Sequence, residues 1–232
     1  MKIGILNAGN IGGRLARAWA AAGHDLVVAK DGEARKLGPL LEDLGDRARF
    51  GTIREAAAFG DVVLFSVYWP RVGAIVEAAR DALDGKIVIE TMNPLGVTAD
   101  FNHVHDLAFM RDGSTSEDLQ RRLPRARIVK AFNLLAAPAL DAAAWAEVPA
   151  KPSIFFASDD AGAGDVTRRL IGDAGFKAVN AGPLQVARQL EQLGVLLHHI
   201  AEHEFAGEAD LVRLAFTVVE AKPGPVMRER IA

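Results

Sequence analysis

The segment Gly4-Ile5-Leu6-Asn7-Ala8-Gly9-Asn10-Ile11-Gly12-Gly13 decides the fold of this 232-residue chain. The apolar run Lys2–Asn7 predicts a first strand, and the residues from Ile11 to Ala22 have helical periodicity. The glycine-rich turn between them lets backbone N–H groups approach an anion at the positive end of the helix. A strand, such a turn and a helix in this order are typical of a dinucleotide-binding Rossmann domain.

The turn carries a modified dinucleotide fingerprint. Gly9 occupies the position where the backbone approaches a pyrophosphate, and Gly12 the position where helix and strand pack closely. Asn7 replaces the first glycine of G-x-G-x-x-G, and asparagine tolerates tight-turn dihedral angles better than other non-glycine residues. Asp31 follows Gly12 by nineteen positions, where a carboxylate can bind a ribose 2′-hydroxyl; the alternative is an ordinary turn residue.

Strand-like and helix-like segments alternate along the chain. The predicted strands are Lys2–Asn7, Leu26–Lys30, Ala48–Gly51, Val62–Val67, Lys86–Glu90, Arg127–Phe132, Ser153–Ala157 and Lys177–Ala181. The predicted helices are Ile11–Ala22, Ala34–Leu44, Val72–Leu83, Glu117–Leu123, Ala161–Ala174 and Leu184–Phe205. We therefore predict an α/β fold of Rossmann type, with a doubly wound, mostly parallel sheet of about eight strands and a long C-terminal helix. Residues 1–182 are expected to form the dinucleotide-binding domain, with residues 183–232 a helix and tail packed on it.

The composition is that of an ordinary globular protein, with 50% hydrophobic and 25% charged residues. The net charge of −3 provides no attraction to nucleic acid or to an anionic membrane. The absence of cysteine excludes a thiolate nucleophile, an iron–sulfur cluster and a thiolate zinc site. The apolar runs are too short to span a bilayer, and no targeting segment is recognisable. We expect a cytoplasmic protein that binds neither nucleic acid nor membrane.

The segment His199-Ile200-Ala201-Glu202-His203 matches the H-x-x-E-H spacing of one class of zinc peptidase. The match is short, and a Rossmann sheet has its own ligand site. We therefore interpret these histidines, with His198 beside them, as a solvated or dimer-facing helix surface, and predict no metal site.

Polar and aromatic side chains follow the central strands, where open α/β sheets bind their ligands. They are Ser66, Tyr68, Trp69, Thr91, Asn93 and Asn133. Neutral hydrogen bonders and flat rings suit a nicotinamide carboxamide and a planar partner, although core packing and loop capping are alternatives. No strand end carries an evident acid–base pair, so no catalytic residue is assigned. For an alcohol or imine substrate, Tyr68, His103 or His105 could donate the proton; the two histidines belong to the long segment Asn93–Ser114, a predicted lid or binding loop.

Three sets of residues give the chain a family resemblance. They are Asn10-Ile11-Gly12-Gly13 with Ala22-Gly23-His24, the pair 61–69 (DVVLFSVYW) and 85–95 (GKIVIETMNPL), and 123–133 (LPRARIVKAFN). Through them the chain resembles the deazaflavin-dependent NADP oxidoreductases, Rossmann proteins that include NADPH:8-hydroxy-5-deazaflavin reductases. It is also similar to the cytoplasmic reductase domain of six-transmembrane metalloreductases. The resemblance implies NADP(H), a deazaflavin or flavin as second substrate, and a homodimer through Leu184–Phe205.

The 2′ end of the cofactor site departs from that family, which usually ends the second strand with Gly-Ser-Arg. This chain has Ala29-Lys30-Asp31, so both NADP(H) and NAD(H) stay open. The predicted dinucleotide-binding residues are Asn7, Gly9, Asn10, Ile11, Gly12, Lys30, Asp31, Arg35, Ser66, Val67, Tyr68, Trp69, Asn93 and Asn133.

These observations favour an NAD(P)-dependent oxidoreductase that passes hydride between a nicotinamide and a flat, small-molecule redox partner. One alternative is a reductase of a small carbonyl or imine. Another is a non-catalytic module that senses NAD(P) and signals through a partner protein.

We predict weak discrimination between NADH and NADPH, because Lys30 and Arg35 attract a 2′-phosphate that Asp31 repels. The substitution Asp31→Ser should shift the ratio of the two dissociation constants toward NADPH. Titration by tryptophan fluorescence measures both constants. A thousandfold preference of the wild type for either cofactor would contradict this balance.

Overall fold

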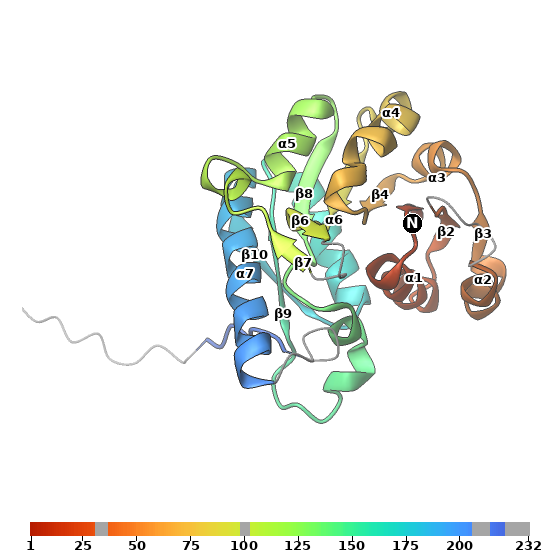
Figure 1. Cartoon of the computed structure of the whole chain (residues 1–232). Coiled ribbons are helices and arrows are strands. Elements are labelled where there is room, and N and C mark those ends of the chain that lie inside the picture. The colour runs from red at the N-terminus through yellow and green to blue at the C-terminus, as the bar shows by residue number, and fades with distance from the viewer. Residues whose placement is uncertain (31–36, 98–102, 206–213, 221–232) are drawn as a thin grey trace, which may run out of the picture.

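An eight-stranded sheet forms the centre of the computed structural model, which describes residues 1–30, 37–97, 103–205 and 214–220. Its order is β10-β9-β8-β5-β4-β1-β2-β3. The strands are β1 (Lys2–Leu6), β2 (Asp25–Val28), β3 (Ala48–Phe50), β4 (Val62–Phe65), β5 (Ile87–Glu90), β8 (Arg127–Ala131), β9 (Ser153–Ala157) and β10 (Lys177–Gly182). Neighbouring strands are parallel except β8 and β9. The chain fills one side of β1 before it returns to the other, so the topological switch point lies between β1 and β4 (Figure 1).

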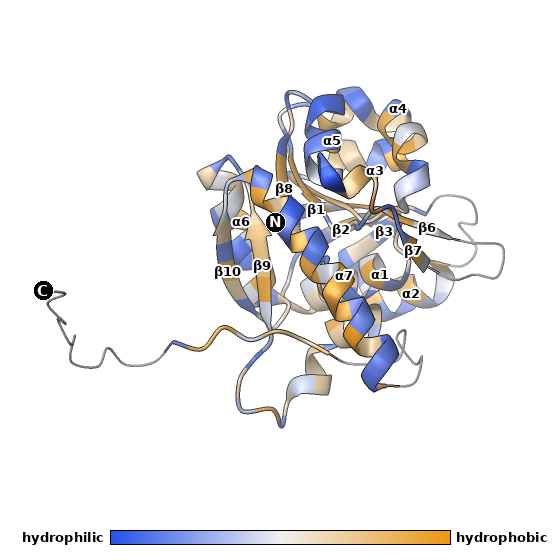
Figure 2. Ribbon diagram, turned by 60° about the vertical axis from the view of Figure 1, so that its left-hand side comes forward, coloured by the Kyte–Doolittle hydropathy of each residue, from blue (hydrophilic) through white to orange (hydrophobic). Residues whose placement is uncertain are grey.

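Helices cover both faces of this sheet, which confirms the doubly wound fold (Figure 1). One face packs against α1 (Asn10–Ala21), α2 (Gly38–Leu44) and α6 (Ala161–Asp173). The other packs against α3 (Ile53–Phe59), α4 (Val72–Leu83) and α5 (Thr115–Arg122). Because successive side chains of a strand point to opposite faces, the strands are apolar on both sides, and Figure 2 shows hydrophobic residues gathered in them.

Helix α3 was not predicted from the sequence, although its first residues contain a helix-capping pattern. Thr52 caps the helix, because its hydroxyl accepts from the Glu55 N–H at 3.2 Å. The Glu55 carboxylate in turn accepts a hydrogen bond from the Thr52 N–H at 2.7 Å, and this contact lowers the pKa of the Glu55 carboxyl. The T-x-x-E pattern of this capping box was the available signal.

The described parts of the segment Asn93–Ser114, residues 93–97 and 103–114, contain regular structure that the sequence did not predict. It contains an antiparallel pair, β6 (Leu95–Val97) and β7 (His103–His105), and a 3-10 turn at Phe109–Arg111. Gly96 in β6 and the two histidines of β7 leave too few apolar residues for these strands to be recognised from periodicity.

The long C-terminal helix α7 (Ala187–Glu204) packs beside α5 and β9 (Figure 2). Residues 214–220 then run along the start of β9, where the Ser153 N–H donates to the Phe216 carbonyl at 2.8 Å. Within the described residues, no helix is both long and apolar enough to cross a membrane.

A buried ionic cluster joins the sheet to α5 and α7. The Lys130 Nζ donates to Glu90 Oε1 at 2.8 Å and to Glu191 Oε1 at 2.7 Å, and all three side chains are excluded from solvent. The Thr115 N–H and the Thr115 hydroxyl also donate hydrogen bonds to Glu191 Oε1, at 2.9 and 2.7 Å respectively. The cluster thus connects β5, β8, α5 and α7 at one point.

Two carboxyl groups share a single ammonium in this cluster. Burial raises the pKa of the Glu191 carboxyl above its ordinary 4.5; Lys130 opposes this shift and Glu90 adds to it. Burial disfavours the charged form of Lys130, but the carboxylates of Glu191 and Glu90 outweigh that effect and raise its pKa. Removal of the ammonium would leave carboxylates in the interior without a counter-ion, which is expensive.

We expect Lys130→Met to lower the free energy of unfolding by about 3–5 kcal/mol, the cost typical of breaking a buried pair. Glu191→Gln keeps an oxygen for Thr115 and leaves one carboxylate for Lys130, so it should cost less. Because the folded-state pKa of Glu191 is raised, its carboxyl weakens the folded state as pH rises above about 4.5. The stability difference between wild type and Glu191→Gln should therefore shrink from pH 4 to pH 7. Urea unfolding at several pH values measures it, and a widening difference would contradict the assignment.

Candidate functional site

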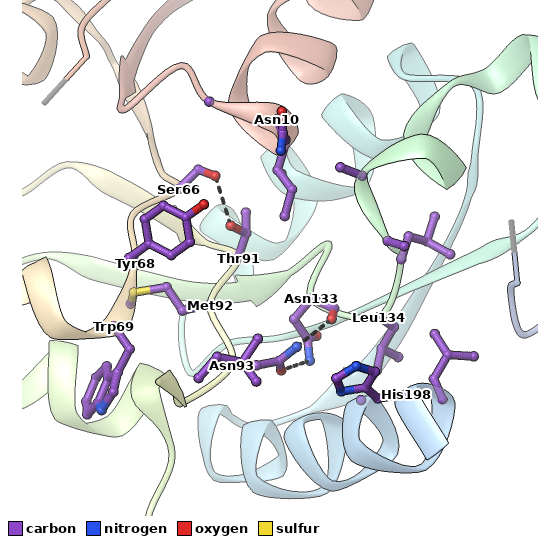
Figure 3. A pocket seen from close by; sticks show the side chains of 18 of the residues that line it. Asn10, Ser66, Tyr68, Trp69, Thr91, Met92, Asn93, Asn133, Leu134 and His198 are labelled. Atoms are coloured by element: carbon purple, nitrogen blue, oxygen red, sulfur yellow. Dashed lines mark hydrogen bonds between the residues drawn. The ribbon is translucent and has the colours of Figure 1, made fainter. Parts of the chain in front are cut away.

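A cavity of about 440 Å³ opens at the carboxyl ends of β1, β4, β5 and β8. Its lining residues come from the β1–α1 turn, the ends of β4 and β5, β6–β7, the segment after β8, and α7. This is the switch-point crevice in which open α/β sheets bind ligands. Figure 3 shows the labelled side chains around it.

The turn after β1 forms one end of the cavity. Asn7 has a φ of 71°, in the left-handed region that asparagine tolerates better than other non-glycine residues. Its side-chain Nδ2 donates to the Ser66 carbonyl at 2.9 Å and so ties the end of β1 to the end of β4. A Cβ on Gly12 would lie 2.7 Å from the Asn7 carbonyl oxygen, so only glycine fits there. At Gly9 the nearest atom to a Cβ would be Asn7 Nδ2 at 3.7 Å, so the protein itself leaves this position open.

The N-terminus of α1 points its first residues, Asn10 and Ile11, at the cavity. No side chain of the described residues caps this helix, and its first turn contains no acidic residue. Helix α6, by contrast, is capped by Asp160, whose carboxylate accepts from the Ala163 N–H. The free N–H groups and the dipole of α1 therefore favour an anion here. Arg14, which the sequence argument missed, also lines this end.

Two asparagines form the floor at the other end. Asn93 Nδ2 donates to the Asn133 carbonyl at 2.9 Å, and Asn133 Nδ2 donates to Asn93 Oδ1 at 3.0 Å and to the Leu190 carbonyl at 3.1 Å. Because both acceptors need an N–H, the orientation of the Asn133 amide is fixed. Its Oδ1 is buried and has no hydrogen-bond partner among the described residues. An acceptor in that state is suited to a donor on a ligand.

Local backbone features bring these asparagines together. Phe132, just before Asn133, has a φ of 62°, which is costly for an aromatic residue. Its buried ring packs edge-to-face on Trp19 with centroids 6.2 Å apart. On α7, a Cβ at Gly194 would come within 3.2 Å of the Asn93 amide, so glycine permits the close approach of this helix.

Hydroxyl groups and aromatic rings occupy the cavity between these two ends. Thr91 donates its hydroxyl to that of Ser66 at 3.2 Å. Tyr68 is 57% exposed and belongs to the rim (Figure 3). The ring of Trp69 packs on Phe109 with centroids 4.8 Å apart. Tyr68 is therefore not a core residue. Trp69 lines the cavity and also packs against the 3-10 turn at Phe109–Arg111.

A histidine pair forms part of the cavity wall next to α7. His105 Nε2 lies 3.2 Å from His198 Nδ1, and both residues line the cavity. This arrangement corrects the interpretation of His198 as part of a solvated or dimer-facing surface. Gly194, Leu197, His198 and Ala201 recur at helical spacing, so one face of α7 closes the site.

The remaining histidines of α7 lie outside the cavity. His199, Glu202 and His203 are exposed, and a potential ligand atom from each lies within 4.8 Å of the others. The His203 Nδ1 already bonds the His199 carbonyl at 2.8 Å.

Most of the predicted dinucleotide-binding residues meet in the cavity. Those that line it are Asn7, Gly9, Asn10, Ile11, Ser66, Val67, Tyr68, Trp69, Asn93 and Asn133. Gly12 lies beneath the turn, and Lys30 is partly buried but does not line the cavity. Asp31 and Arg35 fall outside the described residues. The face of α7 was missed; a glycine in the middle of that helix was the one available signal.

The sequence is similar to that of known reductases. Residues 2–94 match the sequence model of the family described as NADP oxidoreductase, coenzyme F420-dependent. The F420-dependent NADP reductase of Methanocaldococcus jannaschii is 28% identical over 206 residues, which cover 85% of this chain and 91% of that protein. Metalloreductase STEAP3 of Rattus norvegicus is 26% identical over 196 residues, which cover 84% of this chain and 37% of that protein.

A solved structure from Arthrobacter sp. FB24, provisionally described as an F420-dependent NADP-reductase, superposes with a TM-score of 0.75. It is 22% identical, with 88% of this chain and 95% of that chain covered, and so supports the fold. The family resemblance drawn from the sequence is thereby confirmed. The chain is an NAD(P)-dependent oxidoreductase, and its residues 2–94 resemble the family described as NADP oxidoreductase, coenzyme F420-dependent.

Proposed function

We propose that the cavity binds NADP(H) along its length, with the pyrophosphate over α1 and the nicotinamide against Asn93 and Asn133. One observation carries this proposal: an uncapped helix N-terminus lines the same cavity as Asn133, whose buried amide oxygen has no hydrogen-bond partner among the described residues. The first group suits a diphosphate and the second suits the carboxamide of a nicotinamide.

The β1–α1 turn would bind the pyrophosphate through backbone groups. The N–H groups at the start of α1 face the cavity, and the open space at Gly9 allows a phosphate to approach the backbone. Arg14 adds a positive charge at this end. Lys30, Asp31 and Arg35 remain the proposed contacts to the 2′ position of the ribose.

The floor would orient the nicotinamide. Asn133 Oδ1 accepts a hydrogen bond from the carboxamide, while the Asn93–Asn133 contacts hold both side chains rigid. Ser66 and Thr91 lie beside this position, and Tyr68 and Trp69 shield it from water. When bound, the nicotinamide supplies or accepts a hydride, so the protein has to provide alignment rather than a nucleophile.

The redox partner is proposed to be flat, a deazaflavin or flavin. The wall above the floor is apolar, with Leu95, Leu134 and Leu197 among its residues, and aromatic rings form its rim. Such a surface suits a planar ring system. The M. jannaschii relative, an F420-dependent NADP reductase, supports a deazaflavin as the first choice.

We further propose that residues 183–232 act with residues 1–182 as one unit, because α7 supplies one wall of the cavity. A homodimer through α7, where Leu196 is half exposed, and a place in the cytoplasm are proposed as well. Light scattering on the purified protein tests the dimer.

We predict that Gly9→Val raises the dissociation constant of NADPH at least tenfold and leaves the melting temperature nearly unchanged. The new side chain enters space that the phosphates need, whereas its Cβ meets no atom of the protein closer than 3.7 Å. Tryptophan fluorescence gives the affinity and calorimetry the melting temperature. Gly73→Val is the matched control, because Gly73 also faces open space but lies on α4 away from the cavity. Equal affinities in all three proteins would reject the phosphate site.

The acceptor is tested with a panel of oxidants. We expect NADPH consumption to be fastest with deazaflavins, slower with flavins and negligible with small ketones, with or without an amine. Absorbance at the nicotinamide band records the rate. Preference for a carbonyl or imine would replace the proposed partner, and tight NADPH binding without turnover would indicate a sensing module.

A further inference from the structure

The contact between His105 and His198 joins two parts of the chain that are remote in sequence. The rings meet edge-to-face, with centroids 5.4 Å apart and Nε2 to Nδ1 at 3.2 Å. His198 lies one helical turn after Gly194, where an added Cβ would lie 3.2 Å from the Asn93 amide. The pair therefore lies next to the floor proposed for the nicotinamide, and Figure 3 shows His198 on α7 beside that floor.

The surroundings of this pair are mainly apolar. Leu197 and Ala201 flank His198 on the same face of α7, and Leu95 and Leu214 line the cavity nearby. A polar edge in an apolar wall orients a ligand whose body is flat and apolar but which carries one hydrogen-bonding edge.

The geometry of the pair also suits proton transfer. One ring nitrogen donates and the other accepts, so a single proton lies between the two rings. The other nitrogen of His198, Nε2, is 3.7 Å from Glu202 Oε1. The His198 side chain is 26% exposed, so the pair reaches solvent at His198 itself. Imidazole is the side chain best able to exchange protons near neutral pH.

We propose that His105 and His198 form the polar anchor and proton donor for the second substrate, an inference that rests on the proposed function. The substrate is then a conjugated acceptor with a ring nitrogen or carbonyl oxygen in conjugation with the carbon that receives the hydride. As that carbon gains its new C–H bond, the π-electron pair moves to the nitrogen or oxygen. This atom takes a proton from the imidazole pair, and solvent returns a proton to the partly exposed His198. The sum is the addition of one hydride and one proton, a two-electron reduction.

Two substitutions separate the proton from the contact. His198→Asn and His105→Gln each place an amide near the ring nitrogen that makes the contact, so the hydrogen bond can persist while the transferable proton is lost. His199→Asn is the matched control, because the neighbouring His199 side chain is 63% exposed and does not line the cavity.

We expect both pair variants to bind NADPH within twofold of the wild type and to lose about a hundredfold in kcat with the acceptor. Added imidazole should restore part of the His198→Asn rate, which a purely structural role does not predict. A second readout needs no turnover: on addition of NADP⁺ and the oxidised acceptor to ¹⁵N-histidine-labelled protein, the imidazole signals of His105 and His198 should move and those of His199 should not.

A kcat within threefold of the wild type in both pair variants, or an equal loss in His199→Asn, would overturn this inference and leave the proposed function intact. Unmoved His105 and His198 signals in an active protein would do the same. A wild type that neither binds NADPH nor reduces any acceptor would overturn both.

Discussion

A buried ammonium group sets the geometry on which the rest of this structure depends. Lys130 lies in the interior of β8, where its Nζ meets Glu90 from β5 and Glu191 from α7. The residues that follow Glu90 and Lys130 in sequence are those that turn out of the sheet toward the cavity, including Asn93 and Asn133. A single set of charge-assisted contacts thus fixes two strand ends and the helix that covers them, and the cost of an unpaired buried charge opposes any rearrangement.

The cavity depends on α7 as well as on the strands and helices of the Rossmann sheet. The β1–α1 turn can bind a diphosphate with backbone groups alone, but the opposite end of the cavity depends on α7. Gly194 lets that helix approach Asn93, and the Leu190 carbonyl orients the Asn133 amide. The Asn133 oxygen is buried without a partner among the described residues, and the carboxamide proposed to bind there would offset the cost of that burial.

The two ends of the cavity have different chemical characters. The end proposed to bind phosphate combines backbone N–H groups with the cation of Arg14, whereas the far end is apolar except for two amides and a histidine pair. Alignment of two ring systems needs only the amides and the apolar wall. The histidines add a capacity to supply a proton, which a substrate that becomes reduced at both a carbon and a heteroatom requires.

The sequence by itself determined the strands, the glycine turn and the polar residues at the strand ends, because these depend on local periodicity and on chemistry between near neighbours. Asn7 is an example: asparagine was expected to tolerate the dihedral angles of a tight turn, and the structure gives it a φ of 71°. The strands β6 and β7 were not predicted, because their few residues carry too little pattern. Helix α3 was not predicted either, although its T-x-x-E capping box marks its start. Only the tertiary structure decided that Lys130 meets Glu191, 61 positions away, and that His105 meets His198, 93 positions away. Such contacts depend on how α7 packs across the sheet. That packing cannot be deduced from the spacing of residues along the chain, because it brings together residues that are far apart in sequence.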